Sequence, residues 1–214
     1  MWSPFARGTG AWGSVMSFLS TIHGRVVAVS SVLLLGLNLR PVLSGISPLL
    51  DEIQAATGIT GTTAGMLTTL PILAMGLCAL LGETLNSRLG ERLGISLGVA
   101  AIIAACLLRF GMPGAGLLTA TAVLAGFGIA TVQALLPYFI KRTFPEDPGR
   151  ITGLYVTAIM GGAAIGAAAS PVLAGWWRWD AALGFWALPA VAALLLWQAA
   201  ARRHRSSSPQ PRRG

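Results

Sequence analysis

Charged residues are scarce in this chain. Of its 214 residues, 10% are charged, including 7 acidic residues, and 54% are hydrophobic, with a mean hydropathy of +0.71. Soluble domains carry roughly 25% charged residues, so the composition excludes an ordinary soluble protein and indicates a chain embedded in the bilayer. With only 2 histidines and 2 cysteines, the sequence shows no metal-ligand cluster and no nucleophile–base pair. We therefore expect no metal, no cofactor and no enzymatic activity.

Lysine and arginine outnumber the acidic residues, which leaves a net charge of +8. Such a balance can indicate nucleic-acid binding. Here the basic residues fall in short clusters between and after apolar runs, with no continuous basic surface or aromatic platform, so we expect no nucleic-acid partner. Cys78 and Cys106 both lie inside apolar runs, where small buried side chains are expected rather than a disulfide or a metal site.

Six apolar runs approach the ~20 residues that a membrane-spanning helix needs. They are Val26–Leu50, Thr62–Leu81, Gly94–Phe110, Ala115–Ile140, Ile151–Ala174 and Ala181–Ala201. The runs are long and do not alternate, so strands are not expected. The sequence predicts an all-α integral membrane protein with a six-helix transmembrane bundle over residues 25–201. A polar segment (1–24) and a basic tail (202–214) flank it, both expected to be disordered and cytoplasmic; translation from Met16 is an alternative start.

Lysine and arginine are unevenly distributed between the two ends of these runs. With six spans, one side has only Arg109 and Arg178 near its edge. The other side has Arg7, Arg25, Arg88, Arg92, Lys141, Arg142, Arg150, Arg202, Arg203, Arg205, Arg212 and Arg213. Because basic residues are retained in the cytoplasm, both termini are predicted to be cytoplasmic. Topology and contact with anionic lipid account for charges outside the membrane.

One charge lies inside an apolar run. Arg40 is followed by Pro41, within LLLGLNLRPVLSGISPLL. A charge at mid-bilayer costs about 2.5–3.5 kcal/mol or more, so it usually faces a wet cavity or a partner. Pro41 has no N–H, so the carbonyl of Leu37 is expected to lose its helical partner. Arg40 therefore has two interpretations: it attracts an anionic substrate, or it is held by carbonyls freed at the proline or by another helix.

Other polar side chains near this position are candidate substrate contacts. Ser44 lies one turn after Arg40 on the same face, and Asn38 lies well round the helix. Gln133 is the only amide in the fourth run; it suits substrate recognition or a hydrogen bond between helices equally well. No acidic residue lies inside any predicted span, which favours an anion from outside the chain as the partner of Arg40.

Small residues form a ridge in the fifth run, in IMGGAAIGAAASP. The ridge contains Gly161, Gly162 and Gly166, and the last two have the GxxxG spacing that allows helix backbones to approach closely. Close helix packing is the favoured interpretation. A bendable cavity wall is the alternative.

Four stretches carry a family resemblance. LNLRPVLSGISPLL, GIATVQALLPYFIKRTFP, YVTAIMGGAAIGAAASPVL and FWALPAVAALLLWQ together resemble the cyanate transporter family of the major facilitator superfamily, which includes related bacterial exporters of nitroimidazole-type compounds. The superfamily's loop motif, G-x-L-x-D-R-x-G-R-R, is similar to ETLNSRLGER, which keeps Leu85, Arg88, Gly90 and Arg92. Ser87 stands in place of the motif's aspartate, so the conformational latch normally built on that aspartate is not expected.

The resemblance implies one half of a transporter. Superfamily members have two six-helix halves around a central cavity, and this sequence is similar to the amino-terminal half. The implied function is transport of a small anion, with cyanate as the first candidate, by alternating access. In this family the first and fourth helices line the cavity, so Arg40 and Gln133 are implied to face it. Counting along the helices offsets these two residues by roughly 10 Å.

Three alternatives remain. In the first, the chain is a non-transporting remnant or an assembly subunit. In the second, the substrate is a nitroimidazole-like compound that is exported. In the third, another chain supplies a second six-helix half. The implied partners are thus a small anionic substrate, the bilayer and that second half.

Overall fold

The computed structural model describes residues 9–80, 82–111 and 114–206, and all regular structure in those ranges is helical. The helices are α1 (Thr9–Leu39), α2 (Pro41–Ser44), η1 (Ser47–Leu49), α3 (Leu50–Thr57), α4 (Gly61–Leu80), α5 (Gly82–Leu107), α6 (Ala115–Thr143), α7 (Pro148–Trp176), α8 (Trp179–Phe185) and α9 (Ala187–Ser206). Within these ranges, six helical segments are long and apolar enough to cross a membrane. The predicted all-α membrane fold with six spans is confirmed.

Two polar segments between the predicted apolar runs are helical. Residues 50–57 form α3, whose first turn carries Asp51 and Glu52, and acidic side chains stabilise the positive end of a helix dipole. Gly58 ends α3 in the left-handed conformation, with φ of 66°. The second segment, residues 82–93, forms the start of α5, which bends at Gly90. The polar composition of these segments concealed helices that lie at the ends of the spans.

The break expected at Pro41 is present. Helix α1 ends at Leu39, and the chain continues through α2 and η1 into α3. These pieces together form the first candidate span, residues 24–57. The proline ring cannot continue the hydrogen-bond ladder of α1, so the first span crosses the bundle as a broken helix.

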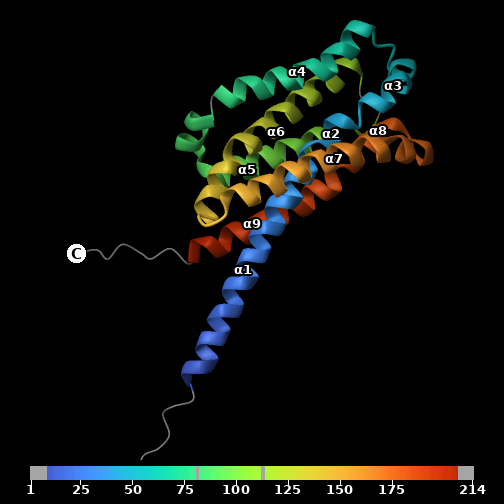
Figure 1. The fold of residues 1–214 in the computed structure, drawn as a ribbon. Helices are drawn as coiled ribbons and strands as arrows, with labels where there is room; N and C mark the ends of the chain where they lie inside the picture. Colours follow the sequence, from blue (N-terminus) through green and yellow to red (C-terminus); the bar gives the residue numbers. More distant parts are fainter. Residues whose placement is uncertain (1–8, 81, 112–113, 207–214) are drawn as a thin grey trace, which may run out of the picture.

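The bundle consists of two groups of three spans. The first span packs mainly against α7 and α9, and α6 packs mainly against α4 and α5; contact between α5 and α9 joins the groups. Figure 1 shows α3 and α8 at the end of the bundle opposite to the C-terminal end of α9. Helices α4 and α7 are the least covered, with 28% and 22% of their apolar windows buried, against 50% for the first span and α6. One flank of each group is therefore open.

Backbone contacts hold the helices together inside each group. A Cβ added to Gly98 of α5 would lie 2.8 Å from the carbonyl oxygen of Gly128 of α6, and the reverse contact would be 2.5 Å. Gly126 of α6 rests on Pro71 of α4, where a Cβ would lie 2.7 Å from the proline Cα. In lipid, where apolar burial gives little driving force, such close approach allows dispersion contacts to hold helices together.

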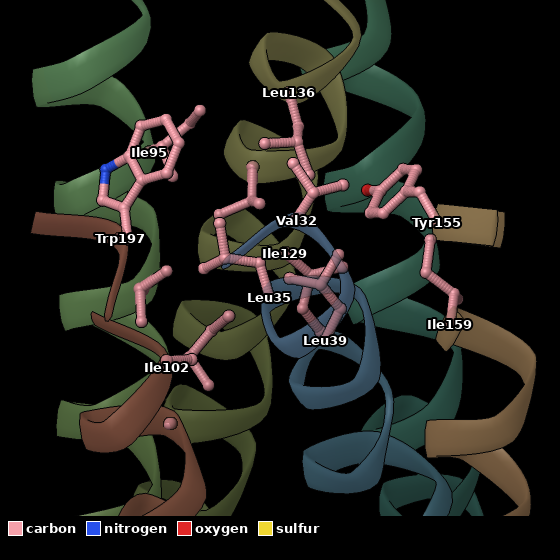
Figure 2. Packing of buried hydrophobic residues seen from close by; sticks show 14 of the residues in the cluster. Val32, Leu35, Leu39, Ile95, Ile102, Ile129, Leu136, Tyr155, Ile159 and Trp197 are labelled. Carbon is pink, nitrogen blue, oxygen red and sulfur yellow. The ribbon is translucent and has the colours of Figure 1, made fainter. Parts of the chain in front are cut away.

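The interior of the bundle is apolar. Figure 2 shows side chains of five helices converging on a shared cluster, with Leu35 from α1 and Ile129 from α6 near its centre. Trp197 of α9 is fully buried, and its ring packs edge-on against that of Phe139, with 4.8 Å between the ring centroids. Cys78 and Cys106 are buried and free, as predicted.

A substitution at Gly162 tests the packing of α7 on the first span. A Cβ there would collide with the carbonyl oxygen of Leu37, whereas Gly161 has open space around it. We expect Gly162→Leu to reduce the yield and thermal stability of the folded chain in detergent, because overpacking costs about 1–3 kcal/mol or more. Gly161→Leu is the matched control and should be near wild type. Equal behaviour of the two variants would contradict the packing role of Gly162.

Candidate anion site at the break in the first span

Arg40 lies at the break between α1 and α2. Its side chain is half-buried, and its Nε is fully buried with no hydrogen-bond partner. Among the described residues, no hydrogen bond or ion pair involves its guanidinium. A buried N–H without a partner costs free energy comparable to a lost hydrogen bond, so this donor is left available for a group that the chain does not supply.

Ser44 provides a second such group. It ends α2, one turn after Arg40, and its Oγ is also buried without a partner. The hydroxyl lies against α7, where Gly166 leaves the space that it occupies; a Cβ on Gly166 would collide with Ser44 Oγ and with Pro41. The predicted ridge thus packs on the proposed site through Gly162 and Gly166, and Gly161 takes no part in that contact.

A different arginine holds the broken backbone. Arg109, which the sequence placed near the outer edge of the membrane, is fully buried, and its Nη1 donates to the carbonyl oxygen of Val42 at 2.8 Å. Holding a freed carbonyl was the structural interpretation of Arg40. In the structure Arg109 donates to this carbonyl, and Arg40 Nε has no partner among the described residues.

Tyr155 is a residue that the sequence reasoning missed. Its ring lies against Gly36: a Cβ added to Gly36 would be 2.9 Å from Cδ2 of Tyr155. The buried hydroxyl of Tyr155 has no hydrogen-bond partner. Figure 2 shows Tyr155 turned from α7 into the packed interior. Its spacing from the glycine ridge could have identified it, because Tyr155 lies seven residues before Gly162, on the same buried face of α7.

The other two candidate contacts lie elsewhere. Asn38 is buried, and its Nδ2 donates to the carbonyl oxygen of Leu34 at 2.8 Å, so its amide is turned back along α1. Gln133 lines a cavity of about 400 Å³ between α4, α6 and the start of α5. That cavity is lined by Met75, Leu80, Gly82, Glu83, Ala130, Gln133, Ala134 and Tyr138. Arg40 is not part of the wall of this cavity, whereas Ser44 follows Arg40 by one turn at the break.

The candidate spans of the structure extend beyond the predicted apolar runs and include acidic residues at their ends, of which Asp180 is buried. Asp180 lies in the first turn of α8, one residue before the predicted sixth run. Its carboxylate accepts two hydrogen bonds from Arg178, at 3.0 and 2.8 Å, and one from the amide of Gly111 at 3.1 Å. This acid therefore pairs with Arg178 and ties two loops together.

The loop motif is held by a different ion pair. Gly90 adopts φ of 68° and ψ of 161°, which only glycine tolerates, and so bends α5. Ser87 donates to the carbonyl of Thr84 at 3.0 Å within its own helix. The adjacent Glu91 lies 2.8 Å from Arg142 at the end of α6. Leu85 is half-buried and Arg88 exposed, while Arg92 accepts a hydrogen bond at its carbonyl from Ser96.

These observations define a class of protein. Two three-helix groups, a broken first span and a half-buried arginine at the break are features of a helical membrane transport protein, and no group of three or more metal-ligating side chains occurs in the described ranges. The chain belongs to the Major Facilitator Superfamily, whose family model matches residues 32–214. Members of this family are transporters, not enzymes.

Curated relatives agree with this assignment. The chain is 38% identical over 178 residues to the cyanate transport protein CynX of Escherichia coli (strain K12), covering 83% of this chain and 46% of the relative. It is 33% identical over 174 residues to the 2-nitroimidazole transporter of the same organism, covering 81% and 44%. An uncharacterized transporter of Bacillus subtilis (strain 168), YycB, is 33% identical over 184 residues, covering 85% and 45%. The chain thus spans about half the length of these relatives.

Proposed function

We propose that this chain forms one half of a transporter that moves a small anion, cyanate first among the candidates, across the bacterial inner membrane. The observation that carries the proposal is the pair of buried groups without partners, Arg40 Nε and Ser44 Oγ, at the break in the first span. Transport as such follows from the family. The identity of the anion, the site that binds it and the location in the bacterial inner membrane are what we propose.

The chemistry of the site supports an anion. Arg40 supplies a permanent positive charge and a planar set of donors, and the hydroxyls of Ser44 and Tyr155 are further donors without partners. None of the salt bridges found in the described ranges involves Arg40. A cationic substrate would be repelled by Arg40, whereas an anion would satisfy its N–H and, one turn further on, the hydroxyl of Ser44.

The size of the site supports a small substrate. Ser44 is seated in the space left by Gly166, and the ring of Tyr155 fills the space left by Gly36, so little room remains between the first span and α7. Cyanate is a small anion, and the relative with 38% identity is named as a cyanate transport protein. A nitroimidazole-like compound, suggested by the second relative, is the alternative, because a nitro group also accepts hydrogen bonds.

A second six-helix half would complete the transporter. The relatives are about twice as long as the matched region, and α4 and α7 are the least covered helices. Apolar side chains such as Leu73 and Leu77 on α4 and Met160 on α7 are exposed there. A second half placed against this flank would bury them, and rocking of the halves would open the site to either side in turn.

The orientation of the chain gives a testable topology. Arg25 and Arg142 lie at the end of the bundle that carries most basic residues, paired with Glu146 and Glu91, and basic residues favour the cytoplasm. We expect reporter fusions after Gly13 and Ser208 to be cytoplasmic and a tag at Gly58 to be periplasmic. A periplasmic signal from the Ser208 fusion would mean that a span is miscounted.

Substitutions of Arg40 test the anion site. The assay is uptake of labelled cyanate by a chimera of this chain with the second half of a full-length relative. We expect Arg40→Gln to lower the affinity on the order of tenfold to a hundredfold, because a hydrogen bond to a charged group is worth about 1.5–3 kcal/mol. Arg40→Lys keeps the charge but loses the planar donors, so it should weaken uptake less.

Arg150→Gln is the matched control, because it removes one exposed arginine in the first turn of α7. Its affinity for cyanate should equal that of the wild type. Unchanged uptake by correctly inserted Arg40→Gln would refute the anion site. Loss of insertion in both Arg40 variants would instead support a structural arginine, and a well-inserted chimera with no uptake would support a non-transporting remnant.

A further inference from the structure

The broken first span leaves a carbonyl that needs a donor. In a regular helix the amide of Ile46 would donate to the carbonyl of Val42, but here it donates to that of Leu43 at 3.1 Å. A carbonyl without a partner inside a membrane costs several kcal/mol. The Val42 oxygen instead accepts a hydrogen bond from Arg109 Nη1 at 2.8 Å.

Arg109 is itself fixed by the fourth span. It follows the end of α5, and its Nε donates to Thr121 Oγ1 of α6 at 3.2 Å. Thr121 in turn donates to the carbonyl of Leu118 at 2.8 Å, within α6. A side chain from the third span thus links the fourth span to the broken part of the first. Its Nη2 is buried without a partner, so these two bonds are what hold the guanidinium.

Val42 lies between the two proposed anion ligands. It is two residues after Arg40 and two before Ser44, in the four-residue helix α2. So short a helix has almost no internal hydrogen-bond ladder of its own. The orientation of its peptide planes, and therefore the directions of the Arg40 and Ser44 side chains, depends on contacts from outside.

We propose that Arg109 is a positioning residue of the anion site. By holding the Val42 carbonyl, it fixes α2 so that Arg40 Nε and Ser44 Oγ can meet one ligand. Arg109 does not touch the anion. This inference rests on the proposed anion site of the preceding section, and it assigns the second buried arginine a role distinct from that of Arg40.

Uptake by the same chimera tests the inference. Arg109→Met should raise the half-saturating concentration of cyanate on the order of tenfold, with the maximal rate per inserted transporter changing less than about twofold. Arg109→Lys, which keeps one donor, should restore part of the affinity. Arg150→Met, which removes an exposed arginine in the first turn of α7, is the control and should leave the half-saturating concentration unchanged.

A milder pair of variants guards against misfolding of Arg109→Met. Thr121→Val leaves Arg109 in place but removes the hydroxyl that holds its Nε, so it should raise the half-saturating concentration in the same direction but less. Thr119→Val removes a hydroxyl that bonds only within α6 and should have no effect. Equal affinities for Thr121→Val and Thr119→Val, together with wild-type affinity in Arg109→Met or Arg109→Lys, would overturn the inference.

Hydrogen exchange in the isolated chain separates this inference from the anion site. The amides of residues 43–46 should exchange faster in Arg109→Met than in Arg150→Met, with or without cyanate. Unchanged exchange would show that Arg109 does not hold α2, whatever Arg40 does. Faster exchange together with wild-type uptake by Arg40→Gln would show that the anion site is wrong although Arg109 holds the backbone.

Discussion

The hydrogen bond from Arg109 to the carbonyl of Val42 is the interaction on which the rest of this structure depends. After Pro41 the first span stays irregular: the amide of Ile46 donates to Leu43 rather than to Val42, which leaves the Val42 carbonyl without a helical partner inside the membrane, where this is costly. Arg109 supplies the missing donor, and Gly166 of α7 lets the first span pack closely beside the break. The irregular backbone is thus stabilised from two sides, and Arg40 need not take part in holding it.

The two embedded arginines therefore differ in what they can do. Arg109 is fully buried and bonded to the backbone and to Thr121. Arg40 is half-buried, and its Nε has no partner. A charge that is retained in a membrane without a partner is a functional hypothesis by default. The contrast within one structure is the physical reason to assign anion binding to Arg40 and support of the backbone to Arg109.

Most of the fold could be predicted from the sequence, because long apolar runs and the break at Pro41 follow from local chemistry. The role of Arg109 could not, because its position after an apolar run resembles a loop, and only tertiary packing buries it under Val42. Tyr155 was missed because an aromatic side chain in an apolar run is not distinctive. The distance of Gln133 from the Arg40 site depends on which faces the helices turn to each other, which residue counting does not give.

The most direct test of the central claim is nitrogen NMR of the arginine side chains in the isolated chain, held in lipid nanodiscs and titrated with cyanate. The account predicts that the Nε–H resonance lost in Arg40→Lys moves on titration and saturates, because this donor has no partner in the chain. The Nε–H resonance lost in Arg109→Lys should stay in place, because it is bonded to Thr121. An Arg40 resonance that does not move at saturating cyanate, or that moves only as the exposed arginines do, would contradict the account.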